Sequence, residues 1–259
     1  MNLSEGKKRM SVDELIKECE GYIYELKTHC VESMFSREYS WCAKHPFKVM
    51  SFVNAMTWRM YDMSHAALSL MKQEAIIPSL CLIRACWENM VATYELKELV
   101  LDCCERQTIT EEVDETLMRI LYSNRYDKDN RYVEGEHYER FKDYKAKNIL
   151  TLVQKLEKGY PQIKDLYSTV CEFVHPNGDG VCGSYSHLDE DTQTVLFFPK
   201  ITQKSPLLPT FITTLTCSID LYLKFMASIE ENITEFTRLC EESLKANTTE
   251  NCKHPIKDV

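Results

Sequence analysis

Apolar residues recur every three to four positions along most of this chain, which is the period of a helix with one buried face. The pattern is clear near the start, where Leu15, Cys19 and Leu26 share a face. A capping box, Ser11 followed by Glu14, marks the beginning of that helix. The period, the prolines and the caps predict helices over about 12–37, 46–74, 78–104, 136–157 and 207–246, and two shorter helices that end near residues 122 and 175.

Two segments break this pattern. Residues 123–135 are polar and unpatterned (SNRYDKDNRYVEG), so we expect a loop. After His175 the chain becomes rich in glycine, and from Thr192 to Phe198 polar and apolar residues alternate. Either a small β-hairpin or an ordered active-site loop is expected there.

The composition supports long helices. Only 7 Gly and 8 Pro occur among 259 residues, fewer than a β-sandwich or barrel of this length needs for its turns. We therefore expect an all-α fold, an antiparallel helical bundle with a small loop or hairpin insertion after residue 175. Along the sequence it divides into an N-terminal helix over 1–45, the bundle over 46–246 with the polar insertion at 176–206, and a flexible tail over 247–259.

Charge and the length of apolar runs argue against some classes of protein. The net charge of −9 argues against broad, non-specific nucleic-acid binding, although it is compatible with a local basic groove. No stretch reaches the roughly 18 uncharged apolar residues of a membrane helix, and the first residues lack the apolar run of a secretion signal. We therefore expect a soluble cytoplasmic protein whose 12 cysteines are reduced and mostly packed as small core residues.

The first candidate site residues lie in the predicted helix over 78–104. Arg84 and Glu88 are four residues apart and share a face, which borders the apolar stripe that contains Trp87. A structural ion pair that fixes helix packing is the ordinary interpretation of this spacing. Alternatively, the two side chains belong to a polar functional site.

The second candidate site is the end of the helix that stops at His175. Tyr167, Cys171 and His175 follow one another at four-residue steps, and Pro176 prevents the helix from continuing. The helix dipole stabilises a protonated histidine at this end, so His175 can exchange a proton near neutral pH. A histidine here is also a common helix cap or packing residue, but the adjoining Glu172 and glycine-rich loop favour a functional role.

These two segments resemble HEPN-type helical proteins, in particular their abortive-infection-like bacterial branches. The resemblance covers about residues 50–240 and rests on a long helix with the pattern L-x-R-x-x-x-E, followed much later by Y-x-x-x-C-E-x-V-H-P-N-G. It implies an all-helical fold and, as in many members, a metal-independent ribonuclease site at a dimer interface, made by a histidine and an arginine shortly before it. His175 matches the histidine, whereas positions 169–171 hold Thr, Val and Cys instead of the arginine.

The resemblance also suggests roles for the candidate residues. Arg84 would replace the missing arginine and stabilise the charge of the phosphorane, while His175 would transfer a proton at the 2′-hydroxyl or the leaving group. Glu88 would orient Arg84 or act as the base. The expected protein is thus a homodimeric ribonuclease with RNA as its substrate and no metal or cofactor, acting as a stress or anti-phage effector. The predicted substrate-binding residues are Asn177, Tyr167 and Trp87.

Three other interpretations stay open. In a non-catalytic helical module, the same polar residues form a structural network and the chain binds a protein partner. In a small-ligand sensor, residues 123–135 and 176–200 form the walls of a ligand site. Zinc ligand types occur at workable intervals, but without paired C-x-x-C spacing, so we expect no metal there. They are Cys171, His175, Cys182 and His187.

Overall fold

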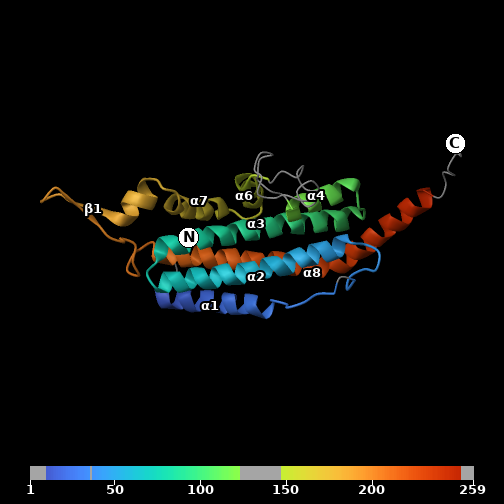
Figure 1. Ribbon diagram of the computed structural model, residues 1–259, viewed down its shortest axis with the longest axis horizontal. Helices are drawn as coiled ribbons and strands as arrows, with labels where there is room; N and C mark the ends of the chain where they lie inside the picture. Colours follow the sequence, from blue (N-terminus) through green and yellow to red (C-terminus); the bar gives the residue numbers. More distant parts are fainter. Residues whose placement is uncertain (1–9, 36, 123–146, 252–259) are drawn as a thin grey trace, which may run out of the picture. The chain divides into compact units, whose positions relative to one another are not determined.

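A computed structural model describes residues 10–35, 37–122 and 147–251 (Figure 1). Within these ranges the chain forms eight helices packed as a bundle and one small antiparallel hairpin. The predicted fold class, an all-α helical bundle with a small loop or hairpin insertion, is therefore confirmed. No helix in these ranges is long and apolar enough to cross a membrane. The predicted loop over 123–135 lies outside the described residues.

The chain divides into two compact units, which are described separately. Unit 1 comprises Met1–His29, Trp58–Glu88 and Tyr160–Leu221, and unit 2 comprises Cys30–Thr57, Asn89–Gly159 and Tyr222–Val259. Three long helices contribute a segment to each unit. They are α2 (His45–Lys72), α3 (Ile76–Arg106) and α8 (Leu208–Asn251), close to the predicted 46–74, 78–104 and 207–246. The predicted division at residues 45 and 246 stays a prediction.

Unit 1 begins with α1 (Val12–Thr28), whose predicted capping box is confirmed. The Ser11 hydroxyl accepts a hydrogen bond from the Glu14 N–H at 3.2 Å, and the Glu14 carboxylate accepts one from the Ser11 N–H at 2.7 Å. The predicted end near residue 37 is wrong, because the helix stops at Thr28. The next backbone N–H, of His29, closes the last turn, and the residues around this end (Thr, His, Cys, Val) are weak helix formers.

A buried aromatic core joins three helices of unit 1. Trp87 of α3 is fully buried, and its indole N–H donates to the Thr214 carbonyl of α8 at 3.2 Å. Phe173 belongs to α7 (Ile163–Val174) and packs edge-on against Phe211 of α8, with ring centroids 5.3 Å apart. Within this unit α8 therefore supports both α3 and α7.

The chain after α7 forms a turn and a hairpin. α7 ends at Val174 with His175 as its C-cap, as the sequence predicts. A π-helical turn, η1 (Gly178–Gly183), leads into β1 (Ser186–Asp189) and β2 (Thr194–Phe197), which pair antiparallel. Of the two predicted alternatives for this segment, the hairpin is confirmed. Figure 1 shows it extending away from the helices of unit 1.

Unit 2 contains α4 (Glu111–Tyr122) and α6 (Ile149–Glu157) beside its segments of the three long helices. α4 ends where the sequence predicts. The predicted helix over 136–157 is wrong at residues 147 and 148, which are not helical. The Asn148 side chain caps α6 by accepting from the Leu150 N–H at 3.0 Å, which sets the start of this helix. Residues 136–146 lie outside the described residues.

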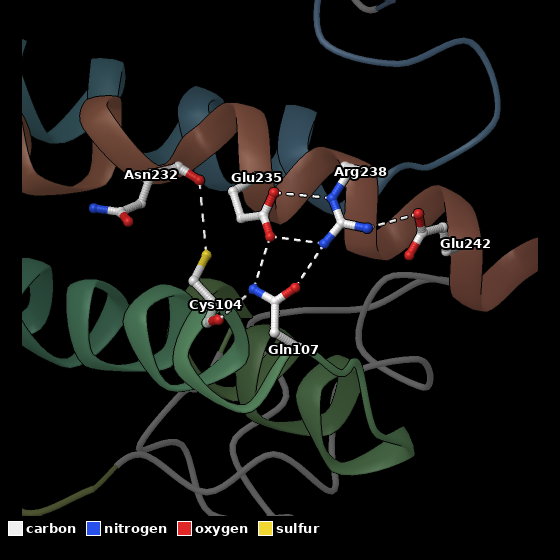
Figure 2. A network of polar contacts seen from close by, with 6 residues as sticks. All are labelled: Cys104, Gln107, Asn232, Glu235, Arg238 and Glu242. Atoms are coloured by element: carbon white, nitrogen blue, oxygen red, sulfur yellow. Dashed lines mark hydrogen bonds and ion pairs between the residues drawn. The ribbon is translucent and has the colours of Figure 1, made fainter.

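A network of polar side chains joins the end of α3 to α8 in unit 2 (Figure 2). Arg238 donates to both carboxylate oxygens of Glu235, at 2.9 and 2.7 Å, and to Glu242 at 2.6 Å. Gln107 has a φ of 53° and follows the last turn of α3. Its amide donates to Glu235 and accepts from Arg238, both at 2.7 Å, so it connects the two helices.

These contacts hold the pKa of Glu235 far below its ordinary value, at about 2, through the hydrogen bonds from Arg238 and then from Gln107. The network therefore stabilises the fold fully above about pH 4.5 and loses its effect as the pH falls toward about 2. We expect Glu235→Gln to unfold at lower urea concentration than wild type at neutral pH, and the two curves to converge in acid. Glu242→Gln, which removes one contact, should show a smaller difference at neutral pH. A gap that stays constant or widens in acid would contradict this prediction.

A buried hydroxyl pair in unit 2 gives a second test of the fold. The Tyr222 hydroxyl lies 2.7 Å from the Thr57 hydroxyl and donates to the Val53 carbonyl at 3.1 Å. Both side chains are fully buried. Tyr222→Phe should therefore lower the free energy of unfolding by about 1–2 kcal/mol, as expected for a lost buried hydrogen bond. Tyr24→Phe is the matched control at a side chain that is 73% exposed, and equal effects in chemical denaturation would count against this packing.

Candidate functional site

The predicted pair Arg84 and Glu88 faces α7 of the same unit. Arg84 Nε donates to Glu88 Oε1 at 3.2 Å, and the Tyr167 hydroxyl of α7 reaches the same oxygen at 3.5 Å. The Arg84 side chain keeps 29% of its surface exposed and that of Glu88 keeps 42%, whereas Tyr167 is buried. The structure thus brings three of the predicted site residues together, with the guanidinium partly open to solvent.

Cys171 completes this cluster, one helical turn after Tyr167. Burial raises the pKa of the Cys171 thiol, and the hydrogen bond with Tyr167 and the charge of Arg84 only partly oppose that effect. Burial, followed by the influence of Cys171 and Glu88, raises the pKa of Tyr167 to about 12. Near neutral pH both groups are therefore protonated, and the charged members of the cluster are Arg84 and Glu88.

His175 lies at the exposed end of the same helix. Its backbone N–H donates to the Cys171 carbonyl at 3.0 Å, which places it one turn beyond the cluster. Within the part of the chain that the structure describes, its imidazole makes no hydrogen bond or ion pair with Arg84 or Glu88. The predicted proton donor and the predicted charge stabiliser therefore belong to facing helices and are not joined by a hydrogen bond or ion pair among the described residues.

The turn after His175 is held by residues whose role the sequence does not reveal directly. Gly180 is buried, and a Cβ there would lie 2.0 Å from the His175 carbonyl oxygen, so only glycine lets the chain close over the end of α7. Asn177 accepts from the Gly180 N–H at 2.8 Å and donates to Glu172 at 2.7 Å. Asn177, predicted to bind substrate, thus already caps η1. The G-D-G spacing after Asn177 is the sequence signal for this tight turn.

Trp87, predicted to bind substrate, is fully buried between α3 and α8. Its ring has no exposed surface on which a base could stack. Its position instead fixes the rotation of α3, so that the neighbouring Arg84 and Glu88 face α7. The contribution of Trp87 to the site is therefore to orient these two side chains.

Neither of the other proposed ligand environments gains support from the described residues. Among them, no three His, Cys, Asp or Glu side chains are grouped as metal ligands, so the candidate zinc set lacks a common centre. One pocket, of about 410 Å³, lies between α1 and α2, and another, of about 580 Å³, lies among α1, α7 and α8. Arg84, Glu88 and His175 do not line either of these pockets. Residues 123–135, one of the two predicted walls of a sensor site, lie outside the described residues.

Comparisons with family models, curated proteins and solved structures find no significant match for this chain. The resemblance to HEPN-type proteins therefore rests on the two sequence segments alone, and it stays a prediction.

The raised pKa of Cys171 predicts a slow thiol. At about pH 7.5 we expect iodoacetamide to modify Cys171 more slowly than the exposed Cys182, because little thiolate is present. The rate at Cys171 should rise steeply in alkaline solution. Peptide mass spectrometry measures both rates in one sample, with Cys182 as the internal control. Faster labelling of Cys171 than of Cys182 near neutral pH would show that the thiol is not buried in this way.

Proposed function

We propose that this chain is a HEPN-like, metal-independent ribonuclease that acts as a homodimer in the cytoplasm, as a stress or anti-phage effector. The observation that supports the proposal is the orientation and partial exposure of the Arg84 guanidinium. Its guanidinium is oriented by Glu88 and Tyr167 yet remains 29% exposed, beside the helix that ends in the exposed His175. A partly open, pre-oriented guanidinium is suited to binding the two non-bridging oxygens of a phosphodiester.

The proposed reaction needs one base, one acid and one cation. A base takes the proton of the RNA 2′-hydroxyl, the oxygen attacks the neighbouring phosphorus, and the bond to the 5′-oxygen breaks. The 5′-oxygen receives a proton, which leaves a 2′,3′-cyclic phosphate and a 5′-hydroxyl. Arg84 stabilises the charge of the phosphorane, and His175 transfers a proton at the 2′-hydroxyl or the leaving oxygen. Glu88 orients Arg84 or acts as the base.

A phosphate has to bridge the two helices for this reaction. His175 is separated by one turn of α7 from Cys171, on whose thiol the charge of Arg84 acts. That separation suits groups that contact different oxygens of one phosphodiester. It also agrees with the absence of a direct hydrogen bond between them among the described residues.

A second candidate, a non-catalytic helical module that binds a protein partner, is favoured by a different observation. Glu88 accepts from both Arg84 and Tyr167, and the Asn177 amide is already bonded to Gly180 and Glu172. Such a network is sufficient to explain these residues as devices that hold α3, α7 and the following turn.

Cleavage of RNA by the purified protein in excess EDTA distinguishes the two candidates. We expect wild type to produce 2′,3′-cyclic phosphate ends, and His175→Ala and Arg84→Ala to lower the rate at least about 10²-fold. His187→Ala and Arg106→Gln are the matched controls, since both residues are exposed and lie outside the cluster. All variants should first be shown to be folded by circular dichroism.

Absence of cleavage by wild type would favour the binding module. Cleavage that survives both substitutions would mean that the activity comes from another site or from a contaminant, and the assignment of Arg84 and His175 would be wrong.

A further inference from the structure

The hairpin of unit 1 carries an unusual concentration of exposed apolar side chains. The exposed fraction reaches 79% at Phe197 and 50% at Leu188. Contiguous apolar surface of this kind marks interaction sites in folded proteins. The large apolar residues exposed along β1, β2 and their flanks are Tyr185, Leu188, Val195, Leu196, Phe197 and Phe198.

Both faces of the hairpin are apolar, and neither is covered within unit 1. The register pairs Leu188 with Val195 and places Phe197 on that same face. Tyr185, Leu196 and Phe198 alternate with them and so belong to the opposite face. A two-stranded hairpin with both faces in water is marginally stable by itself. Pairing with further strands would therefore stabilise it, because a sheet of more than two strands is needed for independent stability.

The outer edge of β2 has free backbone groups to which a strand can bind. The Phe198 N–H donates to the Tyr185 carbonyl at 3.0 Å. Hydrogen-bonded residues alternate along an antiparallel strand, so every second residue of β2, counted back from Phe198, is bonded to β1. The backbone groups of Val195 and Phe197 point away from β1. Pro199 has no N–H and ends this edge, which limits a docked strand to a few residues.

The charges of the hairpin select the strand that fits this edge. The turn is acidic, with Asp189, Glu190 and Asp191, and the stretch from Pro176 to Pro199 contains no Lys or Arg. Lys200 follows directly at the base of β2 and is exposed. A second β2 laid antiparallel would bring each acidic turn beside the Lys200 of the other copy. A parallel arrangement of the two β2 strands would instead place the two acidic turns side by side, where like charges repel. Pairing through the edge of β1 would bring no Lys or Arg near either acidic turn.

We propose that two copies of this chain dimerise through β2, paired antiparallel about a two-fold axis to form a four-stranded sheet. Val195 of each copy lies opposite Phe197 of the other, so the outward-facing groups of both edges are used. The contact is isologous, as two-fold symmetry requires. This assignment rests on the proposed homodimer, for which it supplies the surface, and it does not depend on RNA cleavage.

The test is the mass of the full chain in solution, measured by light scattering and sedimentation over about 1–100 µM, because small interfaces are weak. Wild type should dimerise. Lys200→Glu and Asp191→Lys should each weaken the dimer at least about tenfold, since each replaces two attractive contacts with repulsive ones. Lys204→Glu is the matched control, because it makes the same charge change at an exposed residue outside the hairpin.

Two combinations of these substitutions should restore the dimer and thereby make the test specific. The double variant with Lys200→Glu and Asp191→Lys should dimerise again, and so should an equimolar mixture of the two single variants, because every contact then joins opposite charges. Val195→Pro removes an outward N–H without removing a bond to β1, and it should also give monomers that are folded by circular dichroism.

Three results would overturn the proposal. Monomeric wild type throughout the range would exclude the β2 dimer and, with it, the proposed homodimer. Dimers that persist in all the variants would place the interface elsewhere and leave the proposed homodimer intact. Failure of the mixture to associate, while each single variant is a folded monomer, would exclude antiparallel pairing. RNA cleavage is read separately and decides none of these outcomes.

Discussion

The burial of Trp87 is the constraint on which the arrangement of unit 1 depends. A large indole with no exposed surface fits in only one rotation of α3, and its bond to the Thr214 carbonyl fixes that rotation against α8. Because α8 also contacts α7 through Phe211, the same helix supports both elements of the candidate site. The polar face of α3 is thereby turned toward α7, where Glu88 meets Tyr167. The site is a consequence of how the apolar core is packed.

A second constraint acts where α7 ends. Pro176 stops the helix, and Gly180 allows the chain to return within touching distance of the last carbonyls. This closure leaves His175 exposed at the end of the helix and directs the following strands away from the helices of unit 1. One turn therefore determines both the place of the proposed proton donor and the exposure of the apolar hairpin. A substitution at Gly180 would be expected to disturb both features together, although they lie in different segments.

Much of the helical fold was accessible from the sequence, because a long amphipathic helix repeats its pattern over many turns. α2, α3 and α8 lie close to their predicted bounds for this reason. The predicted bounds are wrong where a local interaction starts or ends a helix although the helical spacing of apolar or charged residues continues. α1 stops at Thr28 although apolar residues continue at helical spacing, and the Asn148 cap starts α6 where the charged pattern alone suggests an uninterrupted helix. Such ends depend on a few hydrogen bonds and weak helix formers, which periodicity does not report.

The candidate site divides in the same way. Arg84 and Glu88 share a helical face, and His175 ends a helix; both relations follow from the amino-acid sequence, because spacing along one helix fixes them. Alternation between two turns limited the segment after His175 to two alternatives, a small hairpin or an ordered loop. The packed fold was needed to show that Tyr167 meets Glu88, that Trp87 and Asn177 already have hydrogen-bond partners, and that both faces of the hairpin are exposed. Contacts between separate elements depend on the packing of the core, and no local pattern encodes which side chain a neighbouring helix will present.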